Sequence, residues 1–392
     1  MIQYLLAVFC IFTLNPYFSW WSSYPYYILS ILLFIVMVNE LYRRKMSLNG
    51  FILFFICVGG GVFYSLLNLT TPHYIGVAFI VFLFVTIIND KTLIVNTYLS
   101  FRTIYSWLVI FSVPLYIYIL FGGKPLGIIS PQNIIKADIG NYDNYLLLIV
   151  FDNQYFSLSK FVFHRLHLIF DEPGVVGTIS AMLLYSSIIC GCRDWKNATF
   201  LLSGFLSFSL AFYFLMFVFV FLYIVTNFVK SYKLVIISAV LFLPLIYSIS
   251  LGVDAPHLKR FNVANISESN NRYSNEITNE INELCSNDLM ECFFGSGENH
   301  AKTIDPAGSS AIYDIIDYGY FFILYVIVFY AIYIYMLNGK NNFLPSCLLF
   351  LLYIINLYQR PFYFTPLIFV VLLGPVVLAA HKNSKKKSEI IY

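Results

Sequence analysis

Long uninterrupted apolar runs are the feature that most limits what this chain can fold into. Of its 392 residues, 60% are hydrophobic and 11% are charged, and the mean hydropathy is +0.78. A soluble fold with this balance would have too little polar surface to cover it. The runs are continuous rather than alternating, which favours helices over a barrel, and about 17–25 such residues cross a bilayer as a helix. The sequence therefore predicts an all-α polytopic membrane protein.

Clusters of basic residues divide the connecting segments into two sides. The positive-inside rule places these clusters in the cytoplasm. Both termini are then cytoplasmic, and Ala198–Phe228 forms two short spans or a helix bent back near Ser207–Ser209. The predicted topology therefore has about 12 transmembrane helices (11–12). The clusters are 42–45, 90–91, 193–196, 230–233, 339–340 and 381–387, and the spans are 2–20, 24–41, 51–69, 74–89, 103–122, 174–191, 198–211, 212–229, 234–250, 312–337, 343–358 and 362–380.

Residues 1–392 are expected to form a single integral membrane domain with two large extracytoplasmic loops, 122–173 and 252–311. In the first loop, "NYLLLIVF" (144–151) is too short to span and is expected at the membrane interface. In the second, "NEITNEINEL" (275–284) predicts an amphipathic helix that lies on the membrane or packs on the bundle. Cys285 and Cys292 share this second loop and could form a disulfide if the loop is extracytoplasmic.

The stretch "RLHLIFDEPGVVGT" (165–178) concentrates ionisable groups at the mouth of a span, and Pro173 marks the start of the helix. In one reading, Asp171 and Glu172 only cap the helix and Arg165 pairs with one of them. In the other, Glu172 has a raised pKa and acts as a base, while Arg165 holds an anion.

Two glycines in the same stretch support the catalytic reading. Gly174 and Gly177 lie on the first turns of the expected helix and leave room for a ligand against it.

The second loop adds three candidates. Arg260 and Arg272 stand in an otherwise acidic segment, where they serve diphosphate binding or are ordinary solvated side chains. His300 follows the turn-rich "FFGSGENH" (293–300) and is either a catalytic group or a plain loop histidine.

Three further residues stand at the outer ends of the last spans. Asp314 and Asp317 lie three residues apart on one helix face, where they bind a sugar hydroxyl or sit at the interface. Arg360 in "QRPF" (359–362) occupies an outer corner against the positive-inside trend. It reaches a lipid phosphate, or it extends to the headgroups.

Together these motifs resemble the Wzy family of O-antigen and capsular polysaccharide polymerases, over most of the chain. Related O-antigen ligases carry His-Asn before the helix that follows the second loop, whereas residues 307–310 here contain no histidine. This departure favours a polymerase over a ligase. The resemblance is carried by the many spans, the two outer loops, "R…FDEPGVVGT" (165–178), "LLSGFLSFSLAF" (201–212), "GSG…SSAIYDIIDYGY" (295–320) and "QRP" (359–361).

The resemblance implies transfer of a glycan from undecaprenyl diphosphate to another lipid-linked repeat unit, at the outer face of the bacterial cytoplasmic membrane. Such chemistry needs a base for the acceptor hydroxyl and positive charge for the departing diphosphate. No Asp-x-Asp pair of the metal-holding kind is present, so a metal-independent enzyme without a cofactor is expected. Glu172 is the first candidate base and His300 the second. Arg165, Arg272 and Arg260 would stabilise the diphosphate, and Arg360 would contact a lipid phosphate.

The expected partners are the lipid-linked donor and acceptor, membrane lipids and a chain-length regulator protein, with no nucleic acid. An O-antigen ligase would use the same donor but lipid A core as acceptor. A repeat-unit flippase would need charges along a central cavity, whereas here the ionisable residues gather in two outer loops. A purely structural or regulatory membrane protein is a third alternative.

Overall fold

The structure is a computed structural model. Apart from a few isolated positions, it describes residues 2–20, 91–131, 140–152, 155–158, 161–226, 274–287, 289–297, 299–306, 310–338, 343–360, 363 and 365–390.

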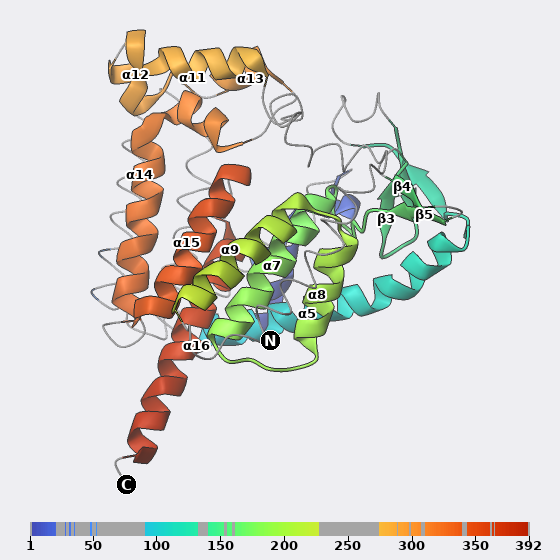
Figure 1. The fold of residues 1–392 in the computed structure, drawn as a ribbon, viewed down its shortest axis with the longest axis horizontal. Helices are drawn as coiled ribbons and strands as arrows, with labels where there is room; N and C mark the ends of the chain where they lie inside the picture. The colour runs from blue at the N-terminus through green and yellow to red at the C-terminus, as the bar shows by residue number, and fades with distance from the viewer. Residues whose placement is uncertain are drawn as a thin grey trace.

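Most of the described chain is helical (Figure 1). Two helices, Lys91–Leu120 and Ala311–Tyr335, are long and apolar enough to cross a membrane, and five shorter apolar helices accompany them. The helices are α1 (Ile2–Phe12), the 3-10 helix η1 (Tyr17–Ser19), α5 (Lys91–Leu120), α7 (Pro173–Ile189), α8 (Lys196–Leu206), α9 (Leu210–Thr226), α11 (Asn275–Asn287), α12 (Leu289–Phe294), α13 (His300–Ile304), α14 (Ala311–Asn338), α15 (Phe343–Gln359) and α16 (Pro366–Ile390).

Helices α7, α14, α15 and α16 correspond to predicted spans. The predicted bend near Ser207–Ser209 is confirmed, because α8 ends at Leu206 and α9 begins at Leu210, with Phe208 at a φ of 44° between them. Helix α5 begins before its predicted span, 103–122. The predicted helix over 2–20 is wrong in its second half, where Asn15 has a positive φ and Pro16 precedes η1. Predicted spans 24–41, 51–69, 74–89 and 234–250 fall outside the described ranges.

The segment 122–173, the first predicted outer loop, contains strands, so the all-α prediction is wrong there. Strands β1 (Gly127–Ile129), β2 (Tyr142–Asn144) and β3 (Ile149–Phe151) form an antiparallel sheet in that order. Strands β4 (Tyr155–Leu158) and β5 (Phe161–His164) form an antiparallel hairpin.

The segment 144–151 is part of the β1–β2–β3 sheet, and its place at the membrane interface stays a prediction. It contains the end of β2, a turn and strand β3, whose residues are all buried. Its β-branched and aromatic residues suit a strand, but strands of three or four residues are too short to show an alternating pattern.

Helix α7 lies at the centre of the bundle. It packs against α8, α9, α15 and α16, and nearly every side chain from Pro173 to Ser187 is buried. A helix that is apolar all round is expected to be enclosed in this way. Helix α5 packs against α1, α8 and α16 on another side of the bundle. Because α7 has 17 residues, its two ends are about 25 Å apart.

Helices α11, α12 and α13 form a layer across the beginning of α14 (Figure 1). Ile277 and Leu284 of α11 are buried and Ile281 is partly buried, as the amphipathic pattern predicted. The apolar face packs on α13 and α14. Of the two predicted arrangements, on the membrane or on the bundle, the structure therefore shows packing on the bundle. The Cys285–Cys292 disulfide is present and joins α11 to α12.

Candidate functional site

The segment Arg165–Phe170 is a buried strap rather than an open loop. Main-chain hydrogen bonds tie it to three other parts of the chain, and Leu166, His167, Leu168 and Phe170 are fully buried. The bonds run from Leu166 N to Leu206 O, from Ile149 N to Leu168 O and from Tyr17 N to Ile169 O, each 2.8 Å long. This strap holds the residues that follow it, Asp171 and Glu172, at the beginning of α7.

Glu172 pairs with Arg360. Its Oε2 accepts a hydrogen bond from Arg360 Nη2, and the two side chains are 36% and 13% exposed. Glu172 occupies the N-cap position of α7 but makes no side-chain cap bond, so the capping reading is wrong for this residue. The pair joins the start of α7 to the end of α15 and brings together two candidates 188 residues apart.

The predicted space for a ligand beside Gly174 and Gly177 is filled by the protein itself. A Cβ atom on Gly174 would overlap the Arg360 guanidinium, and one on Gly177 would overlap the side chains of Ser209 and Ser207. The glycines are therefore needed for close approach of the chain's own groups. Arg360 reaches Glu172 only because position 174 carries no side chain.

Arg165 lies at the same end of α7. Its Nε donates to the main-chain oxygen of Ser207 at 3.1 Å. Ser207 also lies against Gly177. The turn between α8 and α9 therefore positions Arg165 near the beginning of α7, the helix that Glu172 precedes.

Tyr363, in the connection between α15 and α16, was not selected from the sequence. Its hydroxyl donates to Asp314 Oδ2 at 2.8 Å, and its carbonyl accepts from Tyr330 and Tyr353. The connection between α15 and α16 thus contains both Arg360, which contacts Glu172 at the start of α7, and Tyr363, which contacts Asp314 of α14.

Asp317 has a structural role. Its buried carboxylate accepts hydrogen bonds from the main-chain N–H groups of Asn299 (3.0 Å) and Ala301 (2.8 Å), which fastens the start of α13 to α14. His300, between those two residues, is partly exposed and its Nε2 lies 3.2 Å from Oε1 of Glu280. These contacts do not bring His300 to the Glu172–Arg360 pair. Arg260 and Arg272 fall outside the described residues.

Tyr142 is a second residue that the sequence did not single out. Its hydroxyl donates to the main-chain oxygen of Asp171 at 2.6 Å, and its ring packs on Trp20 and His167. Burial raises the pKa of Tyr142, and the negative charges of Asp171 and Glu172 add to the effect. Strand β2 therefore packs directly against the residues that lead into α7.

Comparison of the chain with protein-family models, curated proteins and solved structures finds no match.

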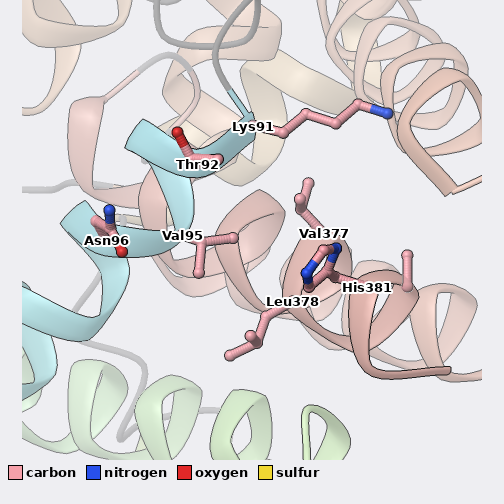
Figure 2. Close-up of a pocket in the computed structure, with 8 residues that line it drawn as sticks. Lys91, Thr92, Val95, Asn96, Val377, Leu378 and His381 are labelled. Carbon is pink, nitrogen blue, oxygen red and sulfur yellow. The ribbon is translucent and has the colours of Figure 1, made fainter. Parts of the chain in front are cut away.

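A pocket of about 470 Å³ lies away from these residues, between the beginning of α5 and the later part of α16. Figure 2 shows Val95 of α5 facing Val377, Leu378 and His381 of α16, with Lys91 at the rim. None of the predicted site residues lines it. The chemistry of the ionisable residues, rather than the size of a cavity, therefore defines the candidate site.

The candidate site consists of the Glu172–Arg360 pair, Arg165 and the Tyr363–Asp314 contact. It offers carboxylates that can accept a proton or a sugar hydroxyl, and guanidinium groups that can hold an anion. Within the described part of the chain, no group of three or more His, Cys, Asp or Glu side chains is placed to hold a metal ion.

Proposed function

We propose that this protein polymerises undecaprenyl-diphosphate-linked oligosaccharide repeat units into O-antigen or capsular polysaccharide at the outer face of the bacterial cytoplasmic membrane. The observation that carries the proposal is the Glu172–Arg360 pair at the beginning of α7. A base candidate and an anion-binding candidate, selected separately from the sequence, are in contact there. Arg165 lies at the same end of the helix.

In the proposed reaction, the donor diphosphate competes with Glu172 for the Arg360 guanidinium. Arginine suits this exchange because its planar donors match phosphate as well as carboxylate. Once released from Arg360, Glu172 is able to accept the proton of the acceptor hydroxyl. The ion pair is therefore the resting form of the site, and donor binding opens it.

The bond changes follow from this arrangement. The acceptor oxygen forms a bond to the anomeric carbon of the donor sugar, and its proton passes to Glu172. The bond between that carbon and the diphosphate oxygen breaks, and undecaprenyl diphosphate leaves with the electron pair. Arg360 and Arg165 stabilise the departing charge, with Arg260 and Arg272 assigned the same task. Asp314, held by Tyr363, is assigned to a sugar hydroxyl.

The proposal needs the beginning of α7, the beginning of α14 and the end of α15 on the outer side, with both termini in the cytoplasm. The positive-inside rule supports this arrangement, because Lys196 and Lys382 lie near the opposite end of α7. The expected partners are the two lipid-linked glycans, surrounding lipids and a chain-length regulator.

The direct test is polymerisation of lipid-linked repeat units by the purified protein in detergent or nanodiscs. Wild type should convert single units into a ladder of longer products, and Glu172→Gln should lose the ladder while still eluting as a folded species. Arg165→Ala should weaken it. Absence of a ladder with active substrate and wild-type protein would refute the polymerase assignment, and an undiminished ladder with Glu172→Gln would refute the base assignment.

Deletion of the gene separates the polymerase from its alternatives. Loss of the polymerase leaves single repeat units on lipid A core. Loss of a ligase leaves none on the core, while polymer accumulates on the lipid carrier. Loss of a flippase leaves single units facing the cytoplasm. Either of the last two patterns would replace the proposed function.

A further inference from the structure

Helix α7 ends in a turn that brings two cysteines together. Cys190 caps the helix, Gly191 follows with a φ of +65°, and the N–H of Cys192 bonds to Ser187 O at 2.8 Å. The N–H of Gly191 bonds to Ile188 O at 3.1 Å, which completes a Schellman motif. Because the glycine reverses the chain within this motif, the sulfur atoms of Cys190 and Cys192 lie 3.2 Å apart.

The two thiols differ in their surroundings. Cys190 is buried, whereas Cys192 is partly exposed at the surface of the turn. The Cys190 thiol donates to the Cys192 sulfur, and this contact leads the causes that lower the pKa of Cys192, with Arg102 and Lys382 contributing. The pair therefore resembles a thiolate held by a neighbouring thiol.

Charged groups around the pair come from α5, from α16 and from the connection between α7 and α8. Arg102 of α5 is buried and its Nη2 pairs with Asp194 Oδ1 at 2.8 Å. Lys382 of α16 donates through Nζ to the main-chain oxygen of Cys190 at 3.0 Å. Asp194 and burial oppose the lowering of the Cys192 pKa. A partly exposed thiol in electropositive surroundings is the environment of a reactive cysteine.

We propose that Cys190 and Cys192 form a redox-active dithiol that hydrogen peroxide oxidises to an intramolecular disulfide. The Cys192 thiolate attacks a peroxide oxygen, the O–O bond breaks, and hydroxide leaves to become water on taking a proton. The Cys190 thiol then attacks the Cys192 sulfenic acid, the S–O bond breaks, and a second water leaves. Two thiols lose two electrons, and the peroxide gains them.

The position of the dithiol gives the reaction a structural consequence. The pair closes the same helix whose first turn follows Glu172, and Lys382 binds the carbonyl at its end. A disulfide across Gly191 must change the turn that the Schellman bonds define. This proposal does not depend on the glycan chemistry, since it stands on the turn and its charged neighbours alone.

The test uses the reduced full-length protein in detergent, treated with hydrogen peroxide, alkylated with N-ethylmaleimide and examined by mass spectrometry. The peptide that contains Cys190 and Cys192 should lose two hydrogens and escape alkylation, and dithiothreitol should restore both thiols. The pair should oxidise about tenfold or more faster than Cys347, which is also partly exposed. Full alkylation of both cysteines after peroxide treatment, or oxidation no faster than that of Cys347, would overturn the proposal.

Single variants keep the test decisive. With Cys190→Ser, Cys192 should stop at the sulfenic acid and react with dimedone, whereas with Cys192→Ser the remaining thiol should stay reduced. In a background with Cys285 and Cys292 replaced by serine, phenylarsine oxide, a probe for paired thiols, should bind the protein with or without Cys347→Ser. It should not bind after Cys190→Ser or Cys192→Ser. Binding that survives Cys192→Ser would contradict the pairing, and monodisperse elution of each variant shows that it has folded.

Discussion

Arg360 contacts Glu172 across 188 positions of sequence and fills the space that Gly174 leaves open. Its own main-chain N–H bonds to Asn356 O at 2.7 Å, which holds it at the end of α15. The residue is thus placed by α15, oriented by α7 and only slightly exposed. Its charge between two predicted spans is visible in the sequence, but its contact with Glu172 is not.

Replacement of Arg360 tests whether that contact serves catalysis. Arg360→Ala should reduce polymerisation by about a hundredfold or more, since it removes a cation from the departing diphosphate. Arg360→Lys should retain part of the activity, because it keeps the charge but loses the planar donors. Arg193→Ala, an exposed arginine at the opposite end of α7, is the matched control and should leave the product ladder unchanged. Equal activity of Arg360→Ala and Arg193→Ala would exclude Arg360 from the site.

Arg102 makes a different kind of ion pair, which we expect to serve stability. It is 1% exposed and bonds to Asp194 and Asn197. Asp194→Ala leaves a buried guanidinium without its anion and should lower the free energy of unfolding by about 3 kcal/mol. Asp194→Asn keeps a hydrogen-bond acceptor and should cost less. Chemical unfolding in micelles measures both, and identical stability of wild type and Asp194→Ala would contradict this role.

The sequence reveals residue types and local order but not long-range partners. Glu172, Arg165, Arg360 and Asp314 were selected because ionisable groups are rare in this chain. Tyr363 carries no such signal, because it is one of 32 tyrosines in the chain. Their contacts depend on how α7, α8, α9, α14 and α15 pack together, and no local sequence pattern specifies that packing.

At the scale of elements, α7 meets the turn between α8 and α9 through Gly177. Glycine inside a helix usually costs stability relative to alanine, by about 0.5–1 kcal/mol. Gly177→Ala should nevertheless destabilise the protein, by about 1–3 kcal/mol, because the added methyl group overlaps Ser209. Gly127→Ala, at a position where an added Cβ meets nothing, is the control. A more stable Gly177→Ala variant in thermal unfolding would show that the close approach is absent.

The strand β5 gives a prediction about pH. Burial lowers the pKa of His164, with partial compensation from the charge of Asp152, so the folded protein favours the neutral imidazole. Its contribution to stability is complete above the unfolded pKa of about 6.5 and declines as the pH falls towards the lowered folded value. Unfolding free energies of wild type should therefore fall relative to His164→Gln below about pH 6.5. Parallel pH profiles for the two proteins would contradict the shift.

Helices were more predictable than strands for a physical reason. A span needs a long apolar run, and Pro173 and the two serines Ser207 and Ser209 mark where helices begin or reverse. The strands in 122–173 are held by pairing with one another and with the strap before α7. Such pairing is a property of the folded chain, so a short apolar run such as 144–151 does not reveal its strand when read alone.

At the scale of the whole molecule, the two ends of α7 have different chemistry. The end at Glu172 contains the candidate site, and the Cys285–Cys292 disulfide lies in the layer that covers the beginning of α14. The end at Cys190 contains a free thiol pair with Lys382 beside it. Disulfides persist on the oxidising side of a membrane and thiols on the cytosolic side. This division agrees with the arrangement that the basic clusters predict.

The candidate site is proposed to face away from the cytosol. Labelling of single cysteines in intact spheroplasts tests this orientation most directly. The background replaces Cys10, Cys57, Cys190, Cys192 and Cys347 by serine and keeps the Cys285–Cys292 disulfide. Single cysteines then replace the exposed residues Leu146, Thr303 and Trp195. A membrane-impermeant maleimide should label positions 146 and 303 in intact spheroplasts and position 195 only after the spheroplasts are permeabilised. Labelling of position 303 or 146 only after permeabilisation would place the site in the cytosol and contradict the account.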